Sequence, residues 1–168
     1  FEGTLTSFSD LEERISTFAS SCAEKMRKQE SSCKAILVFV RSDPHKKNTS
    51  SYRNSCVLTL PYATNSTIIL SRYAILGLRK IFKENIAYKK AGVMIMGLSP
   101  TDKSQLSLFQ NNNEKHVALM KSLDQIHKRF GPYQIKLANQ DLKRTWKMKQ
   151  QHLSSRFTTE LKDIITVK

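Results

Sequence analysis

Cysteine is scarce in this sequence, and its few thiols are not arranged for chemistry. Cys22, Cys33 and Cys56 show no CxxC spacing, and each falls within an apolar pattern. We therefore expect reduced thiols buried in a core, as is usual in reducing compartments. The four histidines are scattered and have no Cys or carboxylate at ligand spacing, so the sequence predicts no metal site.

The sequence also lacks a signal peptide, an anchor motif and an apolar run of membrane-spanning length. Together with the unpaired thiols, this predicts a cytoplasmic protein with no membrane contact. The chain starts at Phe1 rather than Met, and Phe1–Phe8 is typical of a strand that begins at once. We therefore expect the chain to be a fragment of a longer protein.

No set of residues typical of an active site occurs in the sequence. Asp10, Glu12 and Glu13 lie at a predicted helix start, where acidic residues interact favourably with the helix dipole, and the other acids are dispersed. There is no glycine-rich phosphate loop, and no thiol has an obvious activating partner. We expect this chain to have no catalytic activity of its own.

Acidic residues are few compared with basic ones. The sequence has 28 Lys and Arg against 14 Asp and Glu, a formal net charge of +14, which favours a polyanionic partner and nucleic acid first. Residues 1–98 carry 15 basic and 8 acidic residues and residues 99–168 carry 13 and 6, so the charge is not a basic tail. Solvated surface lysines would give the same composition, and composition alone leaves both interpretations open.

Hydrophobic periodicity predicts alternating short elements over residues 1–98. Ser9 and Glu12 have capping-box spacing before a helix that extends to about Lys28. The pattern then predicts a buried strand over Cys33–Arg41, a half-buried strand over Asn54–Leu60 that Pro61 breaks, a helix with the stripe Leu70, Ala74, Leu78 and Ile81, and a last strand over Ala87–Leu98. The order β-α-β-β-α-β predicts an α+β fold with two helices on one face of a four-stranded, mainly antiparallel sheet.

The other face of such a sheet would have no helix over it. If Lys34, Arg41, Arg53, Lys89 and Lys90 point to that face or line its rim, the sheet is a cationic platform that can follow a phosphate backbone. The run AILVFV is apolar at both alternations, so periodicity alone leaves open which residues face outward. Phe39 is flanked by aliphatic residues and is expected in the core.

Beyond Leu98 the composition becomes polar, which predicts a linker over residues 99–113 and a C-terminal region over residues 114–168. A helix is expected over Glu114–Phe130, because Leu119, Met120, Leu123, Ile126 and Phe130 form one stripe and Gly131-Pro132 follows.

The linker contains one apolar cluster, Gln105-Leu106-Ser107-Leu108-Phe109. It resembles the peptide by which bacterial polymerases and repair proteins dock on the DNA sliding clamp. Leu108 and Phe109 would enter an apolar pocket, with Leu106 packing nearby, Gln105 hydrogen-bonding at the rim and Ser107 facing outward. The alternative is a short amphipathic turn that packs on its own domain.

Four segments in order, YKKAGVM from Tyr88, QLSLF from Gln105, LMKSLDQI from Leu119 and WKMKQQHLSSRFTT from Trp146, resemble the UmuC-type Y-family translesion DNA polymerases, the ImpB/MucB/SamB group. The resemblance implies that residues 1–98 form the little finger, whose sheet lies along the major groove of primer–template duplex DNA. It also implies error-prone lesion bypass in the SOS response, with C-terminal contacts to a UmuD-type dimer and a recombinase filament. Trp146, Lys147 and Met148 are candidates for that accessory surface.

The same resemblance implies that nucleotidyl transfer belongs to a palm domain outside this chain, where carboxylates would hold Mg²⁺. We therefore expect no cofactor in these residues. The competing interpretation is a free-standing regulatory or RNA-binding α+β protein. An RNA-binding sheet usually presents aromatic residues for base stacking, and Phe39 is the one mid-strand aromatic in the predicted elements. An enzyme with a site of another kind is a third possibility, but the sequence contains no nucleophile, base or metal-ligand set that supports it.

Overall fold

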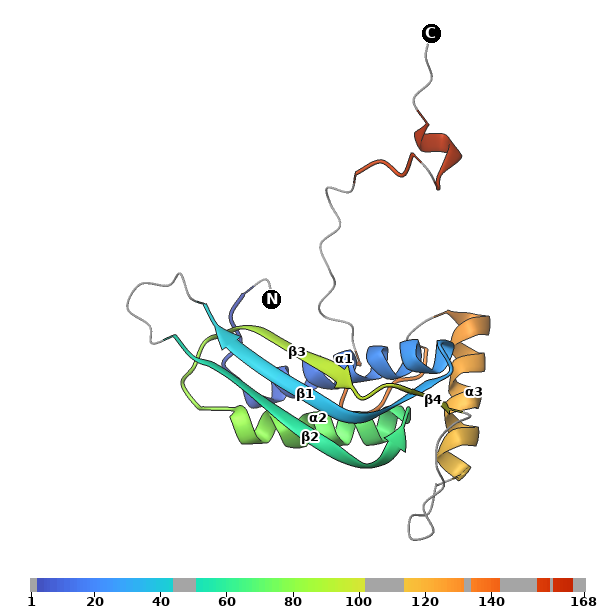
Figure 1. Ribbon diagram of the computed structural model, residues 1–168. Coiled ribbons are helices and arrows are strands. Elements are labelled where there is room, and N and C mark those ends of the chain that lie inside the picture. Colours follow the sequence, from blue (N-terminus) through green and yellow to red (C-terminus); the bar gives the residue numbers. More distant parts are fainter. Residues whose placement is uncertain are drawn as a thin grey trace.

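The computed structural model describes residues 3–43, 51–101, 114–131, 134–142, 154–157 and 159–164. Its elements in order are α1 (Phe8–Lys28), β1 (Ser31–Ser42), β2 (Arg53–Thr64), α2 (Thr67–Ile81), β3 (Tyr88–Met96), β4 (Ser99–Pro100), α3 (Glu114–Phe130) and the short 3-10 helix η2 (Leu161–Asp163) (Figure 1).

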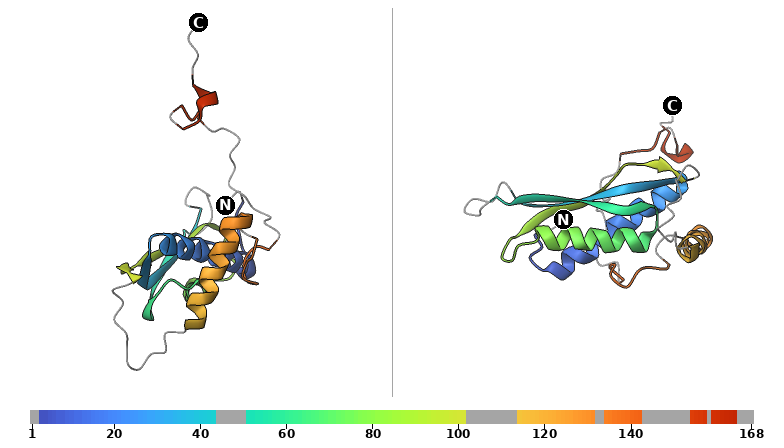
Figure 2. Two further views of the ribbon diagram at one scale, coloured as in Figure 1. Left: turned by 90° about the vertical axis from the view of Figure 1, so that its right-hand side faces the viewer. Right: turned by 60° about the horizontal axis from the view of Figure 1, so that its bottom comes forward.

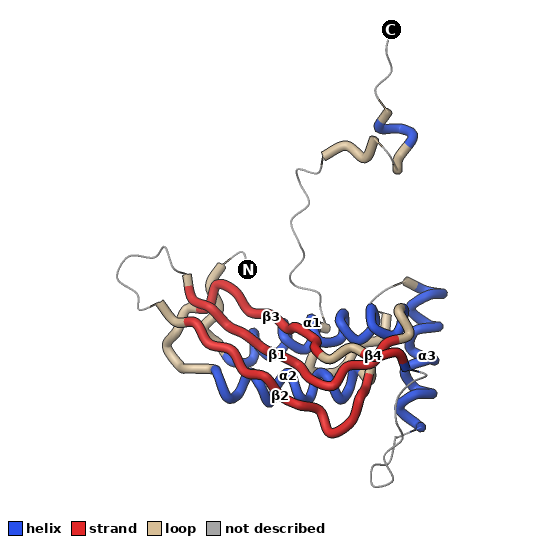
Figure 3. The backbone as a smooth tube through the Cα atoms, viewed as in Figure 1, coloured by secondary structure: helices blue, strands red, loops and turns tan. Residues whose placement is uncertain are grey.

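The strands form one antiparallel layer in the order β2-β1-β3, and β4 pairs with the start of β1. Helices α1 and α2 lie side by side on one face of this sheet, as the views in Figures 2 and 3 show. No described element covers the opposite face of the three long strands. The α+β class with both helices on one face of a four-stranded sheet is therefore confirmed.

The composition of that sheet differs from the prediction at its first strand. Among the described residues of the first segment only Leu5 pairs with the sheet, through two hydrogen bonds of 2.9 and 2.8 Å with Tyr88. Helix α1 then begins at Phe8, with Ser7 rather than Ser9 as its N-cap. At this helix start the Phe8 ring packs edge-on against Phe82, 5.2 Å away between centroids, which closes this end of the core.

Strand β2 also runs further than predicted, because Pro61 does not break it. β2 is an edge strand, where a missing backbone N–H need not disrupt the pairing. The register between β1 and β2 shifts at this point, from Ala35 opposite Thr59 to Cys33 opposite Thr64. The irregularity thus accommodates Pro61 within the strand.

The core lies between the two helices and the sheet. Leu11, Ile15 and Ala19 of α1, Leu70, Ala74 and Leu78 of α2, and Ile36, Val38 and Val40 of β1 are all 0% exposed. The predicted stripe on α2 is therefore confirmed. Gly77 lets α2 approach the sheet closely, since a Cβ at this position would lie 3.0 Å from Cγ2 of Val38. Burial of each large aliphatic side chain contributes about 1.5–3 kcal/mol to folding.

The cysteines are free thiols, and Cys33 is buried in the core as expected. Its thiol donates to the carbonyl of Thr64, with 3.6 Å between sulfur and oxygen. Burial raises the pKa of Cys33 to about 11, with a smaller contribution from Cys22. Both effects keep the thiol protonated at neutral pH, so this cysteine is structural.

Helix α3 has the predicted bounds. It lies across the end of the layer formed by α1 and α2, which we call the helix layer, near the C-terminus of α1 (Figure 2). Its apolar stripe is only partly buried. Met120 is 2% exposed, whereas Leu119 and Phe130 are 49% and 61% exposed. The described helices include none that is long and apolar enough to cross a membrane.

Candidate nucleic-acid interface

Three of the predicted cations form one row across the sheet. Arg41 of β1 pairs in register with Arg53 of β2 on one side and with Lys90 of β3 on the other. Neighbouring strands lie about 4.8 Å apart, so the backbones that carry these three charges span only about 10 Å. We call Arg53, Arg41 and Lys90 the cationic row.

The alternation of β1 decides which way this row points. Ile36, Val38 and Val40 are 0% exposed and face the helices, so Leu37, Phe39 and Arg41 project from the opposite, uncovered face. The partners of Arg41 follow the same alternation: Asn54 and Ala91 lie opposite Val40, and Arg53 and Lys90 lie opposite Arg41. The cationic row therefore lies on the uncovered face of the sheet.

The expectation that Phe39 is a core residue is wrong. Phe39 shares the face of Arg41, opposite Ser55 on one side and Gly92 on the other. Its ring lies over Gly92, as the short distance of 2.5 Å from Cζ of Phe39 to an ideal Cβ at position 92 shows. The absence of a side chain on β3 thus makes room for the ring, which is half-buried as a result.

The next positions on the uncovered face are apolar, which the sequence analysis missed. Leu37 lies between Val57 of β2 and Met94 of β3, whose side chains are 53% and 56% exposed. The uncovered face therefore carries the cationic row at one end and an apolar strip beside it. The alternations of β2 and β3 contained this signal, since Val57 and Met94 share parity with Arg53 and Lys90.

The other two predicted cations lie outside the row. Lys89 is half-buried and is skipped where the register shifts between Arg41 and Ser42, so it lies at the rim beside Lys90. Lys34 is exposed at the opposite end of β1, where its N–H donates to the carbonyl of Gly97. Lys34 and Arg41 are seven positions apart on β1, a distance of about 23 Å at roughly 3.3 Å per residue.

The cationic row forms no intramolecular ion pair within the described ranges. No acidic side chain there forms an ion pair with Arg41, Arg53 or Lys90. Like charges directly opposite each other on neighbouring strands destabilise a sheet. An external anion that bridges the row would relieve this repulsion, so the arrangement suits a phosphate backbone.

Two predicted sites lie outside the described residues. These are the clamp-type peptide Gln105, Leu106, Ser107, Leu108 and Phe109, and the accessory-surface candidates Trp146, Lys147 and Met148. The chain before the first of them is anchored at Thr101, whose N–H donates to the carbonyl of Glu30 at 2.9 Å. The described part of the chain contains no group of three His, Cys, Asp or Glu side chains placed to hold a metal ion.

Comparison with known proteins identifies the family. Residues 1–108 match the impB/mucB/samB family C-terminal domain. This chain belongs to that family. A second match, over residues 117–167, is to a domain of unknown function, DUF4113.

Curated relatives agree with this assignment over almost the whole chain. The chain is 31% identical over 170 residues to Protein UmuC of Salmonella typhimurium, and 34% identical over 168 residues to Protein MucB of Escherichia coli. It is 30% identical over 169 residues to Protein ImpB of Salmonella typhimurium. These alignments cover 98–100% of this chain but only 39–40% of each relative, so the chain spans about 40% of their length. The resemblance to the UmuC-type family is therefore confirmed.

Proposed function

We propose that this chain is the DNA-gripping, clamp-docking part of a UmuC-type translesion DNA polymerase, used in error-prone lesion bypass during the SOS response. Residues 1–98 act as a little finger that binds primer–template duplex DNA through the uncovered face of the sheet. The observation that supports this proposal best is the cationic row, Arg53, Arg41 and Lys90, on a face with no described cover.

The spacing of the row suits the backbone of a duplex. Double-stranded DNA carries one negative charge per about 1.7 Å of helix axis, so cations spread over about 10 Å can contact successive phosphates. The neighbouring apolar strip, with Leu37, Val57 and Met94, can pack against sugar carbons without reading base edges. Binding of this kind depends weakly on sequence and strongly on salt.

The salt dependence of duplex binding tests this assignment. Each phosphate contact contributes about 0.9 to the slope of log K against log salt, so the triple change R41Q/R53Q/K90Q should reduce the slope by about 2.7. Fluorescence anisotropy with a labelled primer–template duplex measures the slope. The matched control is R72Q/K80Q/K121Q, which removes the same charge from exposed positions on α2 and α3. Equal slopes in the two triple variants would exclude the uncovered face as the interface.

We propose that Gln105–Phe109 docks the chain on a bacterial sliding clamp. The support is the sequence itself: two leucines and a phenylalanine in a polar segment, beginning four residues after the anchored Thr101. The double change L108A/F109A should abolish binding to purified clamp and leave duplex binding intact, because the two functions use separate residues. Ser107→Ala is the control, since Ser107 is expected to face outward. Clamp affinity that survives the double change would rule out this peptide as the docking segment.

The proposal divides the rest of the chain by role. Residues 99–113 act as the linker that carries the clamp peptide, and residues 114–168 offer an accessory surface that includes Trp146, Lys147 and Met148, for a UmuD-type dimer or a recombinase filament. No chemical step is assigned to these residues, and Mg²⁺ belongs with the palm domain of the parent polymerase.

A further inference from the structure

The region from α3 to residue 142 contacts the helix layer mainly through polar groups. The buried apolar core consists of residues from α1, β1, β2, α2 and β3, and none of its members comes from residues 114–142. Met120 is the one apolar side chain of the described part of that region that is buried, and its sulfur accepts from the N–H of Thr67 at 3.3 Å. The core is therefore closed without α3.

Arg27 is the centre of this polar contact. Its Nε and Nη2 donate to the two carboxylate oxygens of Asp124, each at 2.7 Å. Its Nη1 donates to the carbonyl of Asn65 and to Oγ1 of Thr67, each at 2.9 Å. The Arg27 side chain is only 9% exposed, so a two-pronged, largely desolvated ion pair joins α1 and the start of α2 to α3.

A second polar contact lies further along the helix layer. The hydroxyls of Ser16 and Ser71 are 2.7 Å apart, and these residues are 0% and 1% exposed. Asn139 accepts from Ser16 through Oδ1 at 2.9 Å and donates to Ser71 through Nδ2 at 3.0 Å. The outer side of α1 and α2 thus presents a pair of hydroxyls that a single amide satisfies.

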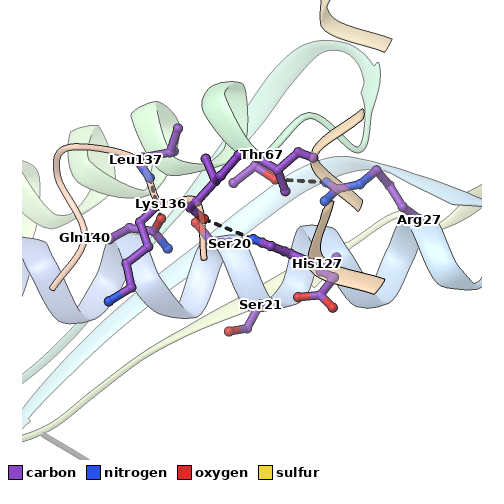
Figure 4. Close-up of a pocket in the computed structure, with 11 residues that line it drawn as sticks. Ser20, Ser21, Arg27, Thr67, His127, Lys136, Leu137 and Gln140 are labelled. Atoms are coloured by element: carbon purple, nitrogen blue, oxygen red, sulfur yellow. Dashed lines mark hydrogen bonds between the residues drawn. The ribbon is translucent and has the colours of Figure 1, made fainter. Parts of the chain in front are cut away.

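Between these two contacts the region is held together around His127. Its Nε2 donates to the carbonyl of Ile135 at 3.0 Å, which ties α3 to the segment after it. Figure 4 shows His127, Lys136 and Gln140 around a small pocket, with Ser20, Arg27 and Thr67 of the helix layer on its other sides. The segments 114–131 and 134–142 therefore meet the helix layer together, as one element.

We propose that the outer surface of α1 and α2 is a recognition site for a helix that carries a carboxylate, and that residues 114–142 dock there as a separable element. Polar, charge-based contacts of this kind are typical of interfaces that open and close rather than of a domain core. The first half of the region that matches DUF4113 would then bind within its own chain, to α1 and α2 of the impB/mucB/samB domain.

Hydrogen–deuterium exchange of the intact chain tests this proposal. Asp124→Asn keeps the size of the side chain but removes its charge, and a hydrogen bond to a charged group is worth about tenfold or more in an equilibrium. We expect amides of α3 to exchange at least about tenfold faster in this variant, while amides of β1 are unchanged. High salt should raise α3 exchange in the wild-type chain by a smaller factor than Asp124→Asn does, because a largely desolvated ion pair is only partly screened.

Two variants make the result specific. Glu84→Gln removes an exposed acid in the α2–β3 connection and should leave α3 protected. Asp124→Glu keeps a carboxylate and should retain more of the protection than Asp124→Asn. Arg27 is left intact, because it also supports the start of α2. Unchanged α3 exchange in Asp124→Asn would overturn the proposal, and so would an equal rise in α3 and β1, since α3 would then open only with the core.

Discussion

Replacing Arg41 with Gln should make the protein more stable and its DNA binding weaker. Arg41 lies directly opposite Arg53 and Lys90, and each like-charged cross-strand pair costs up to about 1 kcal/mol. Coulomb's law agrees: two unit charges about 6 Å apart in water repel by about 0.7 kcal/mol. The loss of part of the Arg41 stem, which is half-buried, offsets some of this gain. We expect a net stabilisation of about 1 kcal/mol at low salt.

Urea unfolding at about 0.02 M and 1 M NaCl measures this effect. The stabilisation should be present at low salt and largely vanish at high salt, where the Debye length is about 3 Å. Arg72→Gln is the control, because its neighbours three and four positions away on α2 are Ile68, Ile69, Ile75 and Leu76, with no like charge among them. A variant that is destabilised at low salt, or stabilised equally at both salt concentrations, would refute the assignment of the row.

The DNA measurement on the same variant separates function from folding. Arg41→Gln should reduce the salt slope of duplex binding by about 0.9, the value for one phosphate contact. A variant that is more stable and yet binds DNA less well cannot owe its weaker binding to unfolding. Unchanged duplex binding in a stabilised variant would instead mean that the row repels itself without serving this ligand.

Two further predictions concern packing and protonation. Gly92→Ala should destabilise the protein by about 1 kcal/mol in thermal unfolding, because the new Cβ would lie 2.5 Å from the Phe39 ring. If Gly92→Ala lowers the stability by the same amount in a Phe39→Leu background, the contact with the ring is not the cause. Burial raises the pKa of Cys33 from 9.0 to about 11, so the folded protein binds this proton more tightly than the unfolded chain does. The contribution of this proton to the free energy of unfolding is therefore complete below pH 9 and is lost as the pH rises toward 11. Cys33→Ala should therefore flatten the decline of the unfolding free energy over that window, and a decline as steep as in Cys56→Ala would contradict it.

The amino-acid sequence by itself determined helices α2 and α3 and strand β3. The stripe of Leu70, Ala74 and Leu78 placed α2 correctly, and the predicted bounds Glu114–Phe130 are those of α3. In β3 the alternation of apolar and other residues assigned both faces. These predictions succeeded because an element with one buried side shows its own period in its own residues.

Only the tertiary structure decided which residues of β1 face the helices and which distant segments contact each other. The run around Phe39 is apolar at both alternations, so its orientation follows from pairing with β2 and β3, which also brings Arg41 between Arg53 and Lys90. Arg27 and Asp124 are 97 positions apart, and no local pattern links them. Periodicity reports how one element is buried, whereas strand register and helix docking depend on several elements at once, and so they are decided only when the chain folds.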